Sequence, residues 1–326
     1  MKPTIDIGTP AEPGPPKEGR QERAAPSMKS PRAIARQRRK DSARRLWAQY
    51  RRSKMGMTGL AIMVFFVLIA IFAPLLASRC DLSAICHPES PAIAPPSAKY
   101  WFGTDIQGRS VLSLTIWGSR ISLIVGLSAT LITVVIGAAI GLVAGYYGGW
   151  RETTLMRLTD WFLVIPFLPL AIVLSVILKP SLYTVIFVIG ITSWPSTARV
   201  IRAQVLSVKT RTYVERARAL GASDWHLVTR HILPNVGPLI FANTILIVAI
   251  AILTETTLSF LGLGPDPTLN ISWGTILEQA FGQGAAFSGF WWWIVPPGVA
   301  IVLLVLAFTM IGYALDDILN PKLRAR

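Results

Sequence analysis

Six long apolar runs separated by polar segments constrain this chain of 326 residues more than any other feature. A run of about twenty apolar residues is long enough to cross the hydrocarbon core of a bilayer as an α-helix. A soluble core does not require so many uncharged runs of this length. The sequence therefore predicts an all-α membrane protein with six transmembrane helices, over residues 57–76, 121–146, 161–178, 182–198, 236–258 and 290–313.

The region before the first apolar run is strongly basic. Residues 1–40 are rich in Pro, Gly, Lys, Arg and Glu without an apolar period, which predicts a disordered cytoplasmic tail. Residues 41–56 place Leu46, Trp47 and Tyr50 among basic side chains at helical spacing, which predicts an interfacial helix on anionic lipid. We therefore expect membrane lipids as the partner of this region, and nucleic acid is the alternative that we reject.

The distribution of Lys and Arg predicts the orientation of the transmembrane domain, residues 57–326. With the N-terminus in the cytoplasm, the inside segments hold 27 of these residues and the outside segments hold 5. Positive charge accumulates on the cytoplasmic side of membrane proteins. Both termini are therefore expected in the cytoplasm of a multi-pass protein.

Glycine and proline mark three of the predicted spans. Gly137, Gly141 and Gly145 recur every four residues in the second span, and such a ridge of small residues lets another helix approach closely. Pro166 in the third span and Pro195 in the fourth interrupt helical hydrogen bonding, which is tolerated where neighbours or a cavity satisfy the freed carbonyls. These prolines indicate either a pathway lining or packing kinks.

A polar and basic segment, residues 213–238, lies between the fourth and fifth apolar runs. Its first part predicts a short helix over residues 213–220, in which Glu215 can pair with Arg211 or Arg218. One face of this helix carries Tyr213, Ala217 and Leu220.

Gly221 then permits a sharp bend at little steric cost. Residues 224–232 predict a second short helix, which Pro234 is expected to stop. The product is a bent pair of short helices on the membrane surface, a shape suited to a groove in another protein.

This segment resembles the EAA loop of permease subunits in bacterial ABC importers. The residues that carry the resemblance are Glu215, Ala217, Gly221, Ile232, Leu233 and Pro234, and Arg216 stands where the motif usually has Ala. In that family the loop is the coupling helix that docks on the cytoplasmic ATPase. The resemblance implies ATPase-coupling roles for Tyr213, Glu215, Ala217, Leu220, Gly221, Ala222, Ile232 and Pro234. The alternative is an ordinary basic loop that holds an amphipathic helix on the headgroups.

Two further segments, residues 100–123 and 255–277, are similar to the dipeptide and oligopeptide branch of these permeases. Asp105 and Arg109 are spaced for a local ion pair or a helix cap. Glu255 is a carboxylate at the outer end of the fifth span, where an ionisable group is costly, so it is a candidate for the outer gate or for contact with a peptide ammonium group. The other candidates for the pathway are Asn243, Pro166 and Trp194.

The cysteines and histidines give two more expectations. Cys80 and Cys86 lie in the first outer loop, where the oxidising medium favours a disulfide between them, two free thiols being the alternative. His226 and His231 are five residues apart, which in an α-helix does not put them on one face, so we expect no metal site. No set of catalytic side chains is visible, and we expect no enzyme.

The resemblance covers roughly residues 41–325 and implies the type I ABC importer permease fold with its cytoplasmic coupling helix. It implies a subunit for di- or oligopeptide import in the bacterial plasma membrane, forming half of the translocation pathway. The implied partners are a second homologous permease, two ABC ATPase subunits or one fused ATPase, and an extracytoplasmic peptide-binding protein.

This chain has no GxxxxGK[ST] motif, so ATP and Mg²⁺ are expected on the ATPase partners, and no cofactor is expected on this chain. Nickel or another small solute is the alternative substrate within the same class of importer. An ion-gradient-driven secondary carrier is the alternative from a different class.

Overall fold

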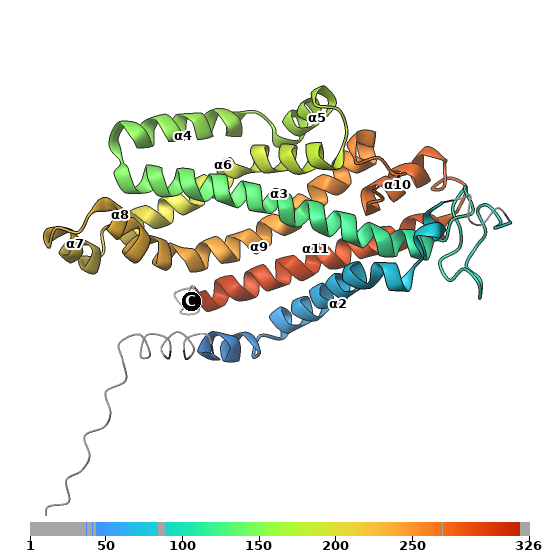
Figure 1. Cartoon of the computed structure of the whole chain (residues 1–326), viewed down its shortest axis with the longest axis horizontal. Helices are drawn as coiled ribbons and strands as arrows, with labels where there is room; N and C mark the ends of the chain where they lie inside the picture. Colours follow the sequence, from blue (N-terminus) through green and yellow to red (C-terminus); the bar gives the residue numbers. More distant parts are fainter. Residues whose placement is uncertain (1–36, 38–40, 42–43, 84–88, 269, 320–326) are drawn as a thin grey trace, which may run out of the picture. The chain divides into compact units, whose positions relative to one another are not determined.

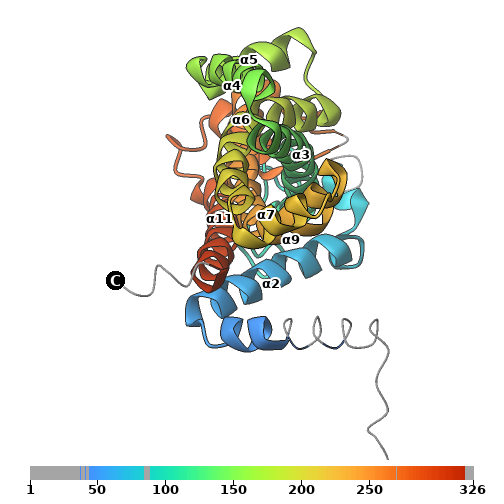
Figure 2. The same cartoon turned by 90° about the vertical axis from the view of Figure 1, so that its left-hand side faces the viewer.

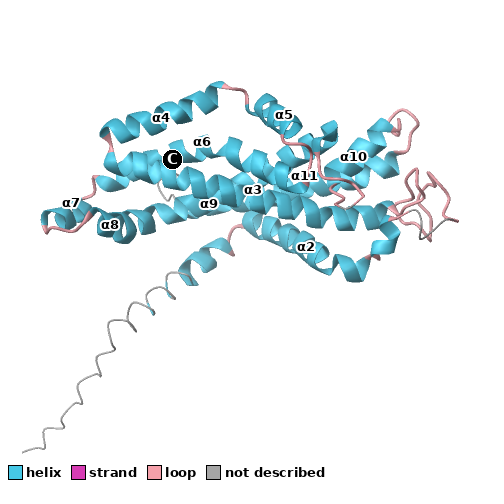
Figure 3. Ribbon diagram, turned by 45° about the horizontal axis from the view of Figure 1, so that its top comes forward, coloured by secondary structure: helices cyan, strands magenta, loops and turns pink. Residues whose placement is uncertain are grey.

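The computed structural model of the protein describes residues 37, 41, 44–83, 89–268 and 270–319. The chain divides into two compact units, Met1–Arg45 and Leu46–Arg326, and every element named below belongs to the second. Within the described residues the structure is helical, and its β structure is one isolated bridge between Thr104 and Ser110 (Figures 1 and 3). This confirms the predicted all-α class.

Five helices in the described part of the chain are long and apolar enough to cross a membrane, or six if one bent pair counts as a span. The bent pair consists of α4 (Gly149–Val164) and α5 (Phe167–Ile177). The long helices are α2 (Lys54–Leu76), α3 (Val111–Tyr147), α6 (Leu182–Lys209), α9 (Leu233–Leu258) with its flanking helical turns, and α11 (Trp291–Leu319).

The third predicted span, residues 161–178, is not one continuous helix. Helices α4 and α5 are bent by 87° at a break that contains Ile165 and Pro166. A residue that precedes proline is driven out of the α conformation by the proline ring, and Ile165 is extended with φ −77° and ψ 125°. The interruption expected at Pro166 is therefore present, and it is sharp: Pro166 follows the end of α4 and precedes α5.

Two other helices are longer than their apolar runs. Helix α3 begins at Val111, ten residues before the predicted span, where Ser110 caps it by accepting a hydrogen bond from the backbone N–H of Ser113. Helix α6 continues beyond residue 198 to Lys209. Hydropathy identifies only the part of a helix that is apolar enough for the hydrocarbon core. It therefore misses helical extensions that contain polar or charged residues.

The glycine ridge of α3 packs against α6. A Cβ atom at Gly137 would lie 2.7 Å from the side chain of Thr197, one at Gly141 would lie 2.6 Å from the carbonyl oxygen of Ala198, and one at Gly145 would lie 2.8 Å from Val205. These distances are shorter than van der Waals contact, so the two backbones can approach only because the side chains are absent. The expected close approach of a second helix is confirmed, and that helix is α6.

The short elements gather at two opposite ends of the helices (Figures 1 and 3). At one end, called here the α7 end, lie α7 (Thr212–Ala219), α8 (Asp224–His226) and the π-helical turn η3 (Leu227–Ile232), seen from in front in Figure 2. At the other, called the α10 end, lie the 3₁₀ turn η1 (Arg79–Leu82), the π-helical turn η4 (Ser259–Leu263) and α10 (Trp273–Gly282).

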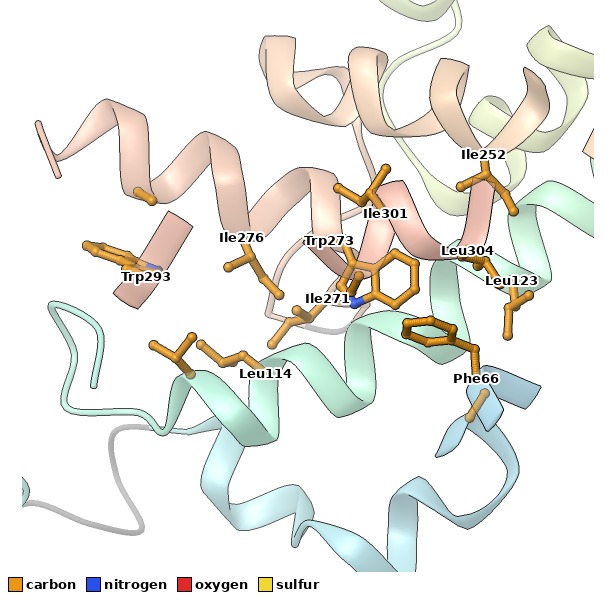
Figure 4. Packing of buried hydrophobic residues seen from close by; sticks show 14 of the residues in the cluster. Phe66, Leu114, Leu123, Ile252, Ile271, Trp273, Ile276, Trp293, Ile301 and Leu304 are labelled. Carbon is orange, nitrogen blue, oxygen red and sulfur yellow. The ribbon is translucent and has the colours of Figure 1, made fainter. Parts of the chain in front are cut away.

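The largest buried cluster surrounds Trp273 at the start of α10 (Figure 4). Its ring meets Phe66 of α2 edge to face at a centroid distance of 5.6 Å, and its indole N–H donates to the carbonyl oxygen of Thr115 in α3 at 2.9 Å. Ser272 and Thr275 form a capping box at the start of α10. The cluster fixes α10 between α2, α3 and α11.

Two aromatic residues depart from a purely interfacial role. Trp293 at the start of α11 is fully buried in the same cluster as Trp273, whereas Trp291 is exposed. Tyr50, before α2, is buried against Ile311 and Ala314 of α11, and its hydroxyl donates to the carbonyl oxygen of Gly56 at 2.8 Å.

Candidate functional site

The α7 end holds a compact, bent segment, residues 212–232, which we call the α7–η3 segment. Val214 of α7 is fully buried and packs with Leu227 and Ile232 of η3. Between them Gly221 adopts φ +82°, a left-handed conformation that costs other residues energy. Ser223 then caps α8 by accepting from the backbone N–H of His226. The predicted bend at Gly221 is therefore present.

The residues predicted in the α7–η3 segment divide into a buried and an exposed group. Ala217, Ala222 and Ile232 pack with Val214, although the sequence placed Ala217 on the same face as Tyr213 and Leu220. Leu220 is 89% exposed and Trp225 is 77% exposed, which leaves two large apolar side chains free for a partner. Also exposed are Tyr213, Glu215, Gly221 and Pro234.

Glu215 and Pro234 behave differently from the sequence expectation. In the described part of the chain no ion pair involves Glu215, so the predicted pairing with an arginine is not formed. Pro234 does not stop the second helix, because α8, η3, α9 and η4 follow one another without a break from Asp224 to Leu263. A π-helical turn precedes Pro234, and in it the backbone N–H of Leu233 donates a hydrogen bond to the carbonyl oxygen of Val228. Pro234 then lies in the first turn of α9, where its missing N–H costs little.

A hydrogen bond ties the α7–η3 segment to the end of α3. The hydroxyl of Tyr146 donates to Oδ1 of Asp224 at 2.5 Å. The guanidinium of Arg218 lies 5.9 Å from the centre of the same ring, and the ammonium of Lys209 lies 5.8 Å from it. Sequence reasoning missed this tie because its partners are 78 residues apart and Tyr146 looks like an ordinary residue at the end of an apolar run.

A cavity of about 420 Å³ opens between α4 and α6 and is lined by four charged residues. Arg202 donates from Nε to Oε1 of Glu152 at 2.7 Å, and Arg199 donates to Oδ1 of Asp160 at 2.5 Å. Both pairs are partly exposed, so each contributes little to stability by itself. Together they hold the bent α4–α5 pair to α6.

At the α10 end, Asp105 and Arg109 form the ion pair that their spacing predicts, with 2.7 Å between Nε and Oδ2. Both are buried, and Arg109 also donates from Nη2 to the side-chain oxygen of Gln279 in α10 at 2.9 Å. Asp105 accepts from the backbone N–H of Arg109, which closes the turn between them. The pair therefore joins the loop before α3 to α10.

Glu255 is fully buried near the end of α9. Its carboxylate accepts from the hydroxyl of Ser122 in α3 at 3.1 Å and from that of Ser259 at 2.8 Å. Ser122 in turn accepts from the backbone N–H of Trp273 at 3.4 Å. Hydrogen bonds compensate a buried carboxylate, and these link α3, α9 and α10.

The other pathway candidates lie apart from this network. Trp194 is buried in α6, where its ring meets Phe162 of α4 edge to face at 5.4 Å. Pro166 is exposed at the α4–α5 break, and Asn243 is half-buried in α9. The structure does not bring these three together with Glu255 or with the Asp105–Arg109 pair.

Two sequence predictions concern the cysteines at the α10 end and the histidines at the α7 end. Cys80 lies in η1, and its partner Cys86 lies outside the described residues, so the disulfide stays a prediction. Groups of three or more His, Cys, Asp and Glu able to hold a metal do not occur among the described residues. The argument that separated His226 from His231 was wrong, however, because η3 is π-helical and their ring centres lie 5.6 Å apart.

Two families match this chain. Residues 137–325 match the family described as binding-protein-dependent transport system inner membrane component. Residues 43–95 match the N-terminal TM domain of oligopeptide transport permease C. The first match covers α4 to α11, including the α7–η3 segment.

Curated relatives match most of the chain. It is 37% identical over 278 residues to the dipeptide transport system permease protein DppC of Bacillus subtilis, covering 85% of each chain. It is 38% identical over 276 residues to the oligopeptide transport system permease protein OppC of Bacillus subtilis, covering 85% of this chain and 88% of that one.

A solved structure shares the fold. That structure is of the MetNI methionine ABC transporter in inward-facing conformations. Its superposition on this chain has a TM-score of 0.51 at 21% sequence identity. It covers 64% of this chain and 95% of that one. This confirms the expected type I importer permease fold.

Family and relatives agree that this is an integral membrane transport subunit without catalytic chemistry of its own, and such permeases act together with ATPase and other permease subunits. The chain belongs to the family of binding-protein-dependent transport system inner membrane components, the permeases of ABC importers, with its relatives among the C-type dipeptide and oligopeptide permeases.

Proposed function

We propose that this chain is a permease subunit of an ATP-driven importer for di- and oligopeptides and forms half of the translocation pathway. The observation that carries the proposal is the identity of 37–38% over most of the chain to permeases named for dipeptide and oligopeptide transport. The second half of the pathway is a homologous permease. An extracytoplasmic binding protein delivers the peptide.

In this proposal the α7–η3 segment is the coupling helix. Its exposed Leu220 and Trp225 offer apolar anchors to a groove on the ATPase, and Glu215 of α7 is also exposed. The buried contacts of Val214 with η3 and the Tyr146–Asp224 hydrogen bond support the transmission of movement to α9 and α3. ATP and Mg²⁺ bind the ATPase subunits, and this chain holds neither.

The α7 end then faces the cytoplasm together with both termini, and the membrane is the bacterial plasma membrane. The excess of Lys and Arg in the segments assigned to this side supports the orientation. The α10 end faces outward, where the networks of Asp105–Arg109 and Glu255 support the outer gate by holding α10 in place. Pro166, Trp194 and Asn243 remain proposals for the pathway.

Purification and reconstitution test the function. Gentle solubilisation from the native membrane is expected to yield this chain with a second six-span permease and a P-loop ATPase, identified by mass spectrometry. In proteoliposomes the complex and its binding protein are expected to take up a labelled peptide only with ATP. Uptake of nickel but not peptide would assign a different substrate, and uptake driven by an ion gradient without ATP would overturn the importer.

A further inference from the structure

Two histidines of the α7–η3 segment lie close together although they are five positions apart in the sequence. His226 belongs to α8 and His231 to the π-helical turn η3. In an α-helix, five residues correspond to a rotation that leaves side chains about 140° apart. The i→i+5 hydrogen bond of a π-helix instead stacks such residues roughly above one another, and the two ring centres lie 5.6 Å apart with 54° between the ring planes.

Both imidazoles are available as ligands. His226 is exposed and His231 is half-buried, so solvent reaches the pair. Among the described residues no hydrogen bond or ion pair uses a ring nitrogen of either histidine. The nearest aromatic neighbour is Tyr213, whose ring centre lies 6.3 Å from that of His231.

The separation of the rings fits one shared metal ion. Imidazole nitrogens bind Zn²⁺ at about 2.0–2.1 Å, and a tetrahedral angle then places the centres of two such rings about 5 Å apart. The observed 5.6 Å is within a small side-chain rotation of that value. Imidazole nitrogen is a ligand that suits Zn²⁺, Ni²⁺ and Cu²⁺ and does not suit Mg²⁺ or Ca²⁺.

We propose that His226 and His231 form a two-histidine site for a divalent first-row transition cation, created by the π-helical turn. A third protein ligand is not within reach in the described part of the chain, so water completes the coordination. The charged neighbours Arg230 and Asp224 lie on the same turns, and Asp224 is engaged by Tyr146. The site supplies two protein ligands, half the number in a structural zinc site. We therefore expect a dissociation constant for Zn²⁺ on the order of 1–100 μM.

The cation joins α8 to η3 across the π turn. Because an α-helical register separates the two rings, only the π register supplies both ligands to one ion. Binding therefore favours the conformation of the α7–η3 segment seen in this structure.

Calorimetric titration of the metal-free full chain with Zn²⁺ tests the site, on protein that carries no polyhistidine tag. The chain contains three histidines, so His87→Gln is a matched control that leaves the pair intact. One Zn²⁺ per chain is expected, with affinity at least about tenfold weaker in His226→Gln and in His231→Gln and unchanged in His87→Gln. Unchanged affinity for Zn²⁺ in His226→Gln or in His231→Gln overturns the proposal. Weaker binding in His87→Gln overturns it as well.

A second measurement uses the unaltered chain and does not depend on the folding of variants. Diethyl pyrocarbonate modifies free imidazoles, and mass spectrometry locates the products. Zn²⁺ is expected to slow modification of His226 and His231 but not of His87, and equal rates with and without Zn²⁺ overturn the site. Neither measurement requires transport, so their failure leaves the proposed importer function untouched.

Discussion

At the scale of single residues, Glu255 shows how a carboxylate is held within a membrane protein. Two serine hydroxyls from different elements donate to it, and one of these serines accepts from the backbone of α10. Removing the carboxylate leaves buried hydroxyls without acceptors, and such groups are costly. The residue therefore has a stabilising role that can be separated from any role in the pathway.

Replacement of Glu255 by Ala is expected to lower the free energy of unfolding by about 1–3 kcal/mol for each hydroxyl left without its partner. Glu255→Gln keeps an acceptor and adds a donor, so it is expected to stay close to the unaltered protein. The midpoint of thermal unfolding in detergent measures both. Equal midpoints for the two variants would show that the hydroxyl contacts do not stabilise the fold.

Tyr146 allows a second test at this scale, because an exposed tyrosine follows it in the chain. Tyr146→Phe removes the bond to Asp224, which as a bond to a charged group is worth about 1.5–3 kcal/mol. If this hydrogen bond carries movement to α3, ATP-driven transport in proteoliposomes is expected to fall by about tenfold or more. Tyr147→Phe is the control, and an equal loss in both variants would contradict the proposed role.

At the scale of elements, Gly221 sets the angle between α7 and α8. Gly221 has φ +82°. Proline cannot adopt this angle because its ring fixes φ near −65°, whereas asparagine tolerates the left-handed region. Among the described residues nothing lies within 4 Å of a Cβ built at Gly221, so the constraint belongs to the backbone and not to packing.

Gly221→Pro is therefore expected to abolish transport while leaving membrane insertion intact, and Gly221→Asn is expected to retain much of the activity. Uptake of labelled peptide and the amount of each variant in the membrane fraction provide the two readouts. Normal transport by the proline variant would remove the α7–η3 segment from the mechanism.

The α3–α6 contact gives a prediction of a different kind. A Cβ at Gly141 lies 2.6 Å from a carbonyl oxygen of α6, and a backbone atom cannot rotate away. Gly141→Ala is expected to reduce stability by about 1–3 kcal/mol through overpacking. Gly298 of α11 is a helical glycine with open space around it in the described structure, so Gly298→Ala is the matched control. Thermal unfolding compares the two.

Hydropathy and spacing predicted the order of the spans, the glycine ridge and the bend at Gly221, because each depends on residues that are neighbours in sequence. The prolines indicated interruptions in the spans, but hydropathy and spacing predicted neither the 87° bend at Pro166 nor the π-helical turn before Pro234. A proline restricts the chain, but the surrounding packing decides whether the helix bends sharply, continues through a wider turn or ends.

The candidate site was predictable in its local part only. The residues of the α7–η3 segment were identified, whereas the roles of Val214 as a buried anchor and Trp225 as an exposed side chain were not. Contacts such as Arg109 with Gln279 join residues 170 positions apart, and one sequence offers no signal for them. The identified residues are thus local, and their connections are tertiary.

At the scale of the whole molecule, the two ends are chemically different and can be labelled separately. Leu220 at the α7 end is 89% exposed and Phe287, after α10, is 96% exposed. In a background with Cys80 and Cys86 replaced by Ser, a membrane-impermeant maleimide applied to intact spheroplasts is expected to label Phe287→Cys and not Leu220→Cys. Inside-out vesicles are expected to give the reverse, and the opposite pattern in both preparations would invert the proposed orientation.

Helix α3 connects these ends by itself. Its 37 residues run from Val111, just beyond the Asp105–Arg109 turn, to the Tyr146–Tyr147 end that contacts Asp224. At 1.5 Å per residue it is about 55 Å long. As a stiff lever pivoting near its middle, such a rod displaces both tips by about 5 Å in opposite directions for a tilt of about 10°. Because the two tips move in opposite directions, one rotation of α3 can widen the pathway at one side of the membrane while it narrows the pathway at the other side.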